Sequence, residues 1–359
     1  MFPLSPLRSA TPTRPRVAVS SRLRVALSTL WLSLLGALVP PAAAQSQLAS
    51  SMSQSGVQAA PSATSLTRAL TPVYRLQEDA SLVQGCFPPC LCPIQLGDDL
   101  RGTFELRPLP TANPLFRTFA VRQVNWLVRL GGVDQRVIGS GIYRVANLPL
   151  GPLHELVLDL VIGDEHGAPV RFDSGLVPGG QRGRFPAIDI QIDANDLSCF
   201  DTLIHVRARS VPRTQLVPYE LKASSSYQEG CLDPCLCPLY LERPVVGNFA
   251  LVRIFEEANA VEFGVVELDW AILPAPPSPL PYFSPVSGSG IYRVEGPFGP
   301  SPSIAGSQRM ILDLDVEGTP DRWDSGPVPG VSLPDISIDL AVNGFFCYDR
   351  IFAVRAAPL

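Results

Sequence analysis

The segment Gly85-Cys-Phe-Pro-Pro-Cys-Leu-Cys-Pro93 occurs a second time in the chain, as Gly230-Cys-Leu-Asp-Pro-Cys-Leu-Cys-Pro238. Each segment carries three cysteines in the spacing C-x3-C-x-C, and a fourth cysteine follows much later, at Cys199 and at Cys347. Other matches keep the same order at offsets of 145 to 154 residues, and the longest is Gly139-Ser-Gly-Ile-Tyr-Arg-Val145, which is repeated unchanged at 288–294. The sequence therefore predicts a tandem duplication of one module.

The length of the repeat indicates two whole domains, because solenoid units have periods of only about 20–50 residues. We expect a signal peptide at 1–44, a Ser/Ala/Gln-rich flexible tether at 45–72, a first module at 73–211, a linker at 212–218 and a second module at 219–359.

Within each module, apolar residues alternate with polar ones. Ile188, Ile190 and Ile192 alternate with Asp189, Gln191 and Asp193, and Ile336, Ile338 and Leu340 repeat the pattern. Phe104 and Leu106 alternate in the same way with Thr103 and Glu105. A period of two places one face of a strand on a core and the other in water. The 38 prolines also favour short elements over long helices.

The first module contains about eight runs of this kind and a ninth weaker one. They lie near 74–77, 93–96, 102–108, 116–129, 136–145, 155–162, 170–176, 187–193 and 202–209. Short strands at this spacing predict an all-β fold with two tandem antiparallel domains of about eight strands each, either closed barrels or sandwiches. Gly139 and Gly141 interrupt one run, and we expect them to mark a bulge or a tight corner.

The N-terminus has the three parts of a secretory signal peptide. Arg22 and Arg24 precede the apolar run Val25–Val39, and the small residues Ala42-Ala-Ala44 follow. We expect cleavage after Ala44 and a secreted or periplasmic protein. The alternative is a membrane anchor, but the run is shorter than the roughly 20 apolar residues that span a bilayer. No other stretch has the length of a span.

The charge of the exported chain argues against binding of nucleic acid. Residues 1–44 contain five arginines and no acidic residue, so the remainder has 28 − 5 = 23 basic and 33 acidic residues, a net charge of −10. An acidic surface repels phosphate backbones.

The eight cysteines suit disulfide bonds, because each module has an even number in an exported chain. They are Cys86, Cys90, Cys92, Cys199, Cys231, Cys235, Cys237 and Cys347. The alternative is a metal site of four thiolates, to which the C-x-C spacing is poorly suited. The pairing stays open, since four cysteines allow three connectivities. If all four pair within a module, one bond must join the start of the module to Cys199 or to Cys347.

The tripeptide Asp-Ser-Gly occurs once in each copy, at 173–175 and at 324–326. It resembles the active-site tripeptide of aspartic proteases, in which two carboxyl groups share one proton. The surrounding residues differ from that family, since Asp321-Arg322 precedes the second copy and Pro327 follows it. The other interpretation is a strand that ends in an Asx-type turn.

The copies share ten charged positions, five in each, and we expect ion pairs within or across the sheets from them. They are Arg144, Asp159, Asp173, Asp201 and Arg207 in the first copy and Arg293, Asp313, Asp324, Asp349 and Arg355 in the second. The histidines His154, His166 and His205 all lie in the first copy, so the shared design does not depend on histidine. No nucleotide, flavin, zinc or calcium motif is present, and the sequence predicts no catalytic residue, metal or cofactor.

The cysteine segments, together with Gly139–Val145 and Cys199-Phe-Asp201, resemble modules of uncharacterised exported bacterial proteins. The resemblance covers both copies and implies no activity. The sequence thus predicts a non-catalytic structural or binding protein whose partner is a protein or a small apolar ligand. One alternative is a carrier that holds an apolar ligand inside a barrel. The second is a hydrolase that uses Asp-Ser-Gly.

Overall fold

The computed structural model describes residues 71–90, 95–110, 113, 115–149, 151–163, 167–180, 183, 185–196, 199–232, 235, 237–238, 242–275, 283–296, 306–330 and 333–359. All of them belong to one compact unit, Ala59–Leu359. The expected signal peptide, the tether up to residue 70, Cys92 and His166 lie outside the described residues. Within the described ranges, no helix is long and apolar enough to cross a membrane.

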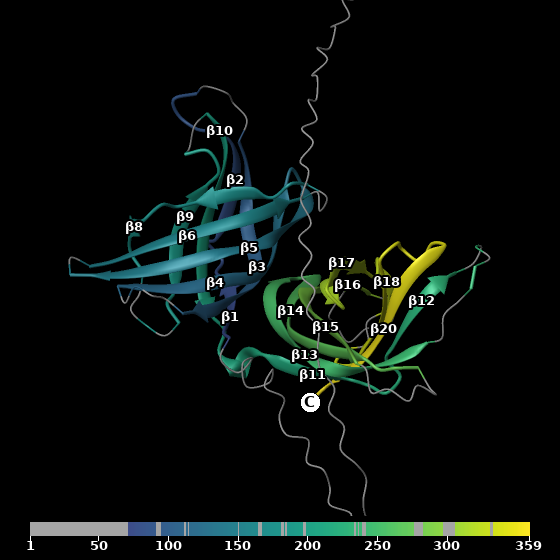
Figure 1. Cartoon of the computed structure of the whole chain (residues 1–359). Coiled ribbons are helices and arrows are strands. Elements are labelled where there is room, and N and C mark those ends of the chain that lie inside the picture. Colours follow the sequence, from purple (N-terminus) through teal and green to yellow (C-terminus); the bar gives the residue numbers. More distant parts are fainter. Residues whose placement is uncertain are drawn as a thin grey trace, which may run out of the picture. The chain divides into compact units, whose positions relative to one another are not determined.

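The first domain, barrel 1, is an antiparallel sheet of ten strand segments that closes on itself (Figure 1). The segments are β1 Val73–Leu76, β2 Ser81–Cys86, β3 Gln95–Leu109, β4 Phe116–Leu130, β5 Val133–Leu148, β6 Gly151–Ile162, β7 Val170–Asp173, β8 Val177–Pro178, β9 Ile188–Asp193 and β10 Phe200–Ser210. β1 and β2 both lie between β3 and β10, and β7 and β8 both pair with β6. The ring therefore has eight strand positions, the number that the sequence predicts.

The second domain, barrel 2, has the same pairing scheme. A short 3-10 helix, Arg213–Gln215, separates it from barrel 1. Its segments are β11 Val217–Leu221, β12 Ser226–Cys231, β13 Arg243–Glu257, β14 Ala260–Ile272, β15 Ser284–Glu295, β16 Ser307–Val316, β17 Thr319–Asp324, β18 Val328–Pro329, β19 Ile336–Ala341 and β20 Tyr348–Pro358. Every pairing in barrel 1 has its counterpart here. The prediction of two tandem all-β domains is confirmed, and of the two architectures considered the structure has the barrel.

The predicted limits of the first strands are wrong. The structure has one continuous strand, β3, where the sequence predicts two runs at 93–96 and 102–108, and β2 was not expected at all. Gln95 to Asp99 are all exposed although they pair with β2, so this part of β3 has no buried face. Periodicity cannot reveal a strand that buries neither face.

The alternating pattern sets the direction of the side chains. Ile188, Ile190 and Ile192 are buried, as are Ile336, Ile338 and Leu340, which confirms the predicted inner faces. Thr103 is an exception, because it was expected to face water and is buried instead. It packs against Gly264 of barrel 2, where a Cβ atom would lie 2.9 Å from Thr103 Cγ2. At Thr103, the outward face of β3 is thus covered by the second barrel.

Gly139 and Gly141 allow two strands to approach closely. A Cβ atom at Gly139 would lie 2.1 Å from the carbonyl oxygen of Asp159, and one at Gly141 would lie 2.0 Å from that of Val157. Their partners on β4 flank a register shift between Val121 and Val124. The glycines therefore face a bulge in the neighbouring strand and do not form it themselves.

Large side chains fill the described interior of each barrel. In barrel 1, the Tyr74 ring stacks on Phe104, whose edge meets Trp126. In barrel 2, Phe352 contacts the rings of Trp270 and Trp323. Fully burying an aromatic side chain contributes about 1.5–3 kcal/mol, so these rings are a major part of each core.

The two barrels are joined by an ion-pair network around Glu262 of β14, whose side chain is 1 % exposed. Arg101 of barrel 1 donates to both carboxylate oxygens, at 2.5 and 3.1 Å. Arg293 of β15 donates to Glu262 at 3.0 Å and to Asp134 of barrel 1 at 2.9 Å. A buried carboxylate is tolerated when guanidinium groups surround it in this way. Beside this network, Val73 of β1 packs with Ala250, Val252 and Val266.

Disulfide bonds tie the beginning of each barrel to its last strand. Cys90 bonds Cys199, and Cys235 bonds Cys347, with Cα atoms 5.1 Å apart in both pairs. Cys231 bonds Cys237 within one loop. Cys86 is also disulfide-bonded. None of the cysteines in the described ranges is free. The long-range bonds each lie within one module.

The two disulfides of barrel 2 should differ in their contribution to stability. Cys235–Cys347 closes a separation of 112 residues and Cys231–Cys237 a separation of 6. In the chain-entropy model, these loops correspond to about 5 and about 2 kcal/mol. We expect C235A/C347A to lose clearly more free energy of unfolding than C231A/C237A, measured by guanidinium denaturation of the full chain. Equal losses would show that the ring closure does not depend on the long bond.

Candidate functional site

The Asp-Ser-Gly tripeptides form turns at the ends of β7 and β17. The amide of Gly175 donates to Asp173 Oδ1, and that of Gly326 donates to Asp324 Oδ1, both at 2.8 Å. Ser174 Oγ accepts the amide of Leu156 at 2.9 Å. Ser325 makes the same bond to Met310 at 3.0 Å. The geometry is that of the Asx-type turn, in which the carboxyl and hydroxyl groups bind nearby backbone.

Arg309 pairs with Asp324, 2.5 Å away, and affects its titration. Burial acts to raise the pKa of this carboxyl, but the hydrogen bonds from Arg309 and from the Gly326 amide outweigh burial, so the pKa lies below its ordinary value. Asp324 is therefore an ionised structural acceptor at neutral pH.

Asp201 and Asp349 are buried carboxylates that organise the loop before the last strand of each barrel. Asp201 accepts the amides of Ala194, Asn195 and Thr202 at 3.2, 3.2 and 2.6 Å. Asp349 is 1 % exposed and has the same role in barrel 2. Several backbone donors satisfy a buried carboxylate without a cation.

Three shared arginines form ion pairs within their own barrels. Arg207 pairs with Asp79 and Asp189. Arg355 pairs with Asp339 at 2.6 Å, and Arg144 with Glu155 at 3.1 Å. These are the ion pairs expected within the sheets.

Two shared positions have different roles in the two copies. Asp159 is exposed on barrel 1, whereas its counterpart Asp313 binds Arg136 of barrel 1 at 2.6 Å. Likewise, Arg293 bonds Glu262 and Asp134 in the interbarrel network, although its counterpart Arg144 pairs within barrel 1. Duplication thus left the same charges available, and in barrel 2 they form part of the contact with barrel 1.

His154 is buried against Tyr143, whose hydroxyl lies 3.2 Å from His154 Nδ1. The matching residue in barrel 2 is Gln308, which accepts the hydroxyl of Tyr292 at 2.7 Å. A glutamine in the same place indicates that this position needs a hydrogen-bond partner for tyrosine and not a titrating group. His205 lies on the outer surface and contacts Asp189 at 2.8 Å.

A cleft of about 1080 Å³ is lined by residues of both barrels. Its charged side chains largely bind one another, as in the pairs Arg207 with Asp79 and Arg253 with Glu256. A site whose charges are already paired offers little to a ligand. None of the described residues form a group of three or more His, Cys, Asp and Glu side chains able to hold a metal ion.

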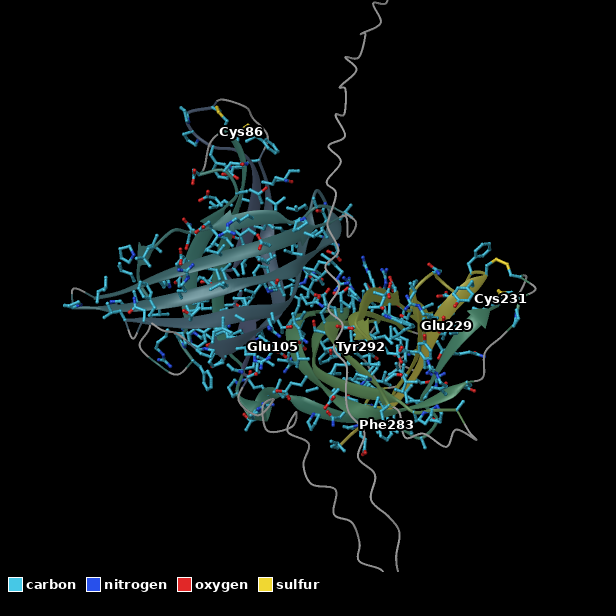
Figure 2. All side chains as sticks on the ribbon, viewed as in Figure 1. Cys86, Glu105, Glu229, Cys231, Phe283 and Tyr292 are labelled. Carbon is cyan, nitrogen blue, oxygen red and sulfur yellow. A yellow bond between two sulfur atoms is a disulfide. The ribbon has the colours of Figure 1, made fainter. Side chains whose placement is uncertain are left out.

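We call the end of each barrel that carries the cysteines its tip end. In barrel 2 it is the end at which Cys231 of β12 pairs with Tyr348 of β20. Figure 2 shows Cys231 and Glu229 along β12, toward this end. The loop before β20 and the residue that follows β12 lie side by side there, since the amide of Leu232 donates to the carbonyl of Cys347 at 2.9 Å.

Exposed aromatic side chains concentrate at the tip ends. Six are exposed among the described residues: Phe185, Phe200, Phe283, Phe345, Phe346 and Tyr348. Phe345, Phe346 and Tyr348 surround Cys347, so three of the six lie at the tip end of barrel 2. Phe200 follows Cys199 at the tip end of barrel 1. Figure 2 shows Phe283 away from Cys231, on another part of barrel 2. We name Phe345, Phe346 and Tyr348 the aromatic tip.

The loop that carries the aromatic tip is held rigidly. Asp349 accepts the amides of Val342, Asn343, Phe345 and Arg350, at 2.7 to 3.0 Å. The disulfide to Cys235 fixes the next turn. Phe345 has a φ of 65°, a conformation that bulky residues adopt only when their surroundings impose it. Rings held in place before binding lose little entropy on contact with a partner.

Behind the aromatic tip, barrel 2 has a cluster of charged and aromatic groups. Arg350 pairs with Asp321 at 2.7 Å and lies 5.5 Å from the ring centre of Trp323. Arg243 lies 4.8 Å from the ring centre of Tyr227. The hydroxyls of Tyr227 and Tyr348 both donate to Glu229. Burial, reinforced by the charge of Glu229, raises the pKa of Tyr227, so its hydroxyl stays protonated.

Barrel 1 lacks this cluster. Its residues at the positions of Tyr227, Glu229, Arg243, Asp321, Trp323 and Arg350 are Leu82, Gln84, Asp98, Val170, Phe172 and Thr202. The scaffold residues are thus shared, while the residues around the tip of barrel 2 differ. A surface built on one of two otherwise equivalent barrels is typical of a specialised site.

No family model, curated protein or solved structure matches the chain.

The two copies differ most in sequence in their loops, especially at the Pro-rich segment Pro274–Pro285 of the second copy, and this difference does not indicate the aromatic tip. Most of that Pro-rich segment, 276–282, lies outside the described residues. The adjacent aromatic residues Phe345 and Phe346 are equally consistent with a buried core strand, so the sequence alone does not identify them as exposed. The Asn343-Gly344 dipeptide before them is a turn signal that indicates an exposed position.

Replacing His154 with glutamine should remove a pH dependence without loss of the tyrosine hydrogen bond. Burial lowers the pKa of His154, against a smaller opposing effect of Asp189, so the folded protein holds the ring neutral. As the pH falls from about 7 to about 5, the unfolded chain binds a proton there that the folded protein does not, and stability decreases. A glutamine side chain binds no proton in this pH range, so the variant should not lose stability in this way. We therefore expect His154→Gln to gain stability relative to the wild type at the lower pH, measured by urea unfolding. A difference that stays constant with pH would contradict this account.

Proposed function

We propose that this chain is an exported, non-catalytic binding protein. Its two barrels are the scaffold, and the aromatic tip of barrel 2 is the recognition surface. The observation that carries the proposal is the concentration of exposed aromatic side chains at the tip ends, most of them at barrel 2. Exposed apolar groups gathered on one surface mark interaction sites, and aromatic residues dominate binding energy at such sites.

The roles of the shared polar residues support a scaffold. Asp173, Ser174 and Asp201 bind backbone amides in turns, and their counterparts in barrel 2 do the same. A hydrolase based on Asp-Ser-Gly would need these carboxyl groups to face a substrate. Aromatic side chains occupy the barrel interiors, which favours a binding surface outside the barrel over an apolar carrier.

Export is supported by the signal-peptide pattern of residues 1–44 and by the disulfides. Disulfides persist in oxidising compartments and are rare in the cytosol. The Ser/Ala/Gln-rich composition of 45–72 suits a tether between the cleavage site and barrel 1.

Site-specific photocross-linking tests the location of the recognition surface. Benzoylphenylalanine in place of Phe346, in the full chain expressed in its producing cell, should give discrete adducts, which mass spectrometry can assign to protein or lipid. Val246 is exposed on the wall of β13 and provides the matched control. No adduct from position 346, or the same adducts from position 246, would exclude the tip as the recognition surface.

A further inference from the structure

A pocket of about 340 Å³ opens on the outer wall of barrel 2, beside the aromatic tip. Its floor includes Ile351 and Ala353 of β20, which face outward because Phe352 between them is buried in the core. Leu232 and Phe345, from the two loops at the tip end, complete its apolar lining. Phe345 is one of the three rings of the aromatic tip, so the pocket continues the proposed recognition surface along the wall.

The polar side chains of the pocket include one charge that is not compensated. Arg355 donates to Asp339 at 2.6 Å and to two backbone carbonyls at 2.9 and 3.0 Å, so these two side chains form a neutral pair. Glu242 accepts a hydrogen bond from the hydroxyl of Ser226 and has no ion-pair partner among the described residues. Two carboxylates and one guanidinium therefore line the pocket, which leaves it with a net negative charge.

The corresponding place on barrel 1 is filled. In the shared pairing scheme, His205 takes the position of Ala353, so an imidazole replaces a methyl group on the wall. Gly97 takes the position of Glu242, and a Cβ atom there would lie 2.9 Å from Cγ2 of Val83. Val83 thus leaves no room for an acidic side chain. The fold therefore does not require the pocket or its carboxylate, and both distinguish barrel 2 from its duplicate.

This combination of groups suits an arginine side chain. A guanidinium group binds a carboxylate such as Glu242 through two parallel N–H bonds, and the Gln228 amide on the same wall can accept a third. The aliphatic stem of arginine packs along apolar surface, which Leu232 and Ile351 provide. The exposed ring of Phe345 attracts a guanidinium over its face. A small apolar ligand would use none of the polar groups, whereas arginine is enriched at protein interfaces.

We infer that this pocket binds an arginine side chain of the protein that the aromatic tip recognises. Glu242 forms the ion pair with the guanidinium, and Leu232, Phe345 and Ile351 contact the rest of the side chain. The inference rests on the proposed function, because it names a chemical feature of the partner of the same surface, to which Phe345 belongs.

Methyl-resolved NMR of the expected exported chain, residues 45–359, tests the inference. The probe is Nα-acetyl-arginine methylamide, and its neutral isostere, Nα-acetyl-citrulline methylamide, is the matched ligand. We expect the arginine probe to shift the methyl signals of Ile351 and Ala353 at millimolar concentration. The citrulline probe should bind at least about threefold more weakly, because it lacks the charge that pairs with the exposed carboxylate of Glu242.

Two variants of barrel 2 and one of barrel 1 assign the binding to this pocket. Ala353→His places on the floor the residue that barrel 1 has there, and it should abolish the shift of the Ile351 methyl signal. Glu242→Gln should remove the preference for arginine over citrulline, and it should fold because Glu242 is exposed. His205→Ala in barrel 1 is the control and should leave the affinity unchanged. Circular dichroism checks the fold of each variant.

Equal affinity for the two probes, binding that remains in folded Ala353→His, or absence of any shift in the wild type would overturn the inference. The proposed function has a separate readout. Protein adducts from position 346 without binding of the arginine probe would keep the recognition surface and remove the arginine pocket. Adducts with lipid alone would exclude a protein partner. Probe binding without any adduct would keep the pocket but refute its assignment to a partner of the aromatic tip.

Discussion

The covalent bond between Cys235 and Cys347 is the constraint on which the rest of barrel 2 depends. It joins the loop after the first strand position to the start of the last strand, β20, and so closes the ring where β12 meets β20. The amide of Leu232 donates to the carbonyl of Cys347 at 2.9 Å, which continues the contact beyond the strands. Next to this bond, the buried carboxylate of Asp349 gathers four backbone amides. Together these interactions give the loop 342–348 a single conformation, and the exposed rings are a consequence of that conformation.

Comparison of the two barrels distinguishes the residues that the fold requires, which both barrels share, from the residues that can vary. Both barrels need the long disulfide, the buried aspartate before the last strand and the glycines that let β5 approach β6. The outer surfaces are under fewer restrictions. Asp313 and Arg293 therefore join the barrels, while their counterparts remain within barrel 1. At the tip ends the divergence is larger, because connections between strands tolerate changes in length and composition that strands do not.

The sequence was sufficient to predict the repeated all-β fold, because buried faces leave a strong period of two, as in Ile188–Asp193. The prediction of strand limits failed for Gln95–Asp99 at the start of β3, where no face is buried. The sequence also predicts that Thr103 faces water. A period of two describes the faces of one module only, and here the neighbouring barrel covers this residue. The Asp-Ser-Gly turn was one of two interpretations, and the decisive contacts, such as Ser174 with Leu156, join residues on different strands. The rings of the aromatic tip lie in the loop before β20, and their exposure depends on the conformation that the Cys235–Cys347 bond and Asp349 give this loop, which neighbouring residues in the sequence do not reveal.

The fold should not require the rings of the aromatic tip. The free energy of unfolding tests this in the full chain in which Phe345-Phe346 is replaced by Leu-Ser, the pair that barrel 1 has at 197–198. We expect a change of no more than about 1 kcal/mol, since surface substitutions away from core contacts have small effects. A loss of more than about 3 kcal/mol, the cost of emptying a core position, would show instead that the rings belong to the core of the barrel.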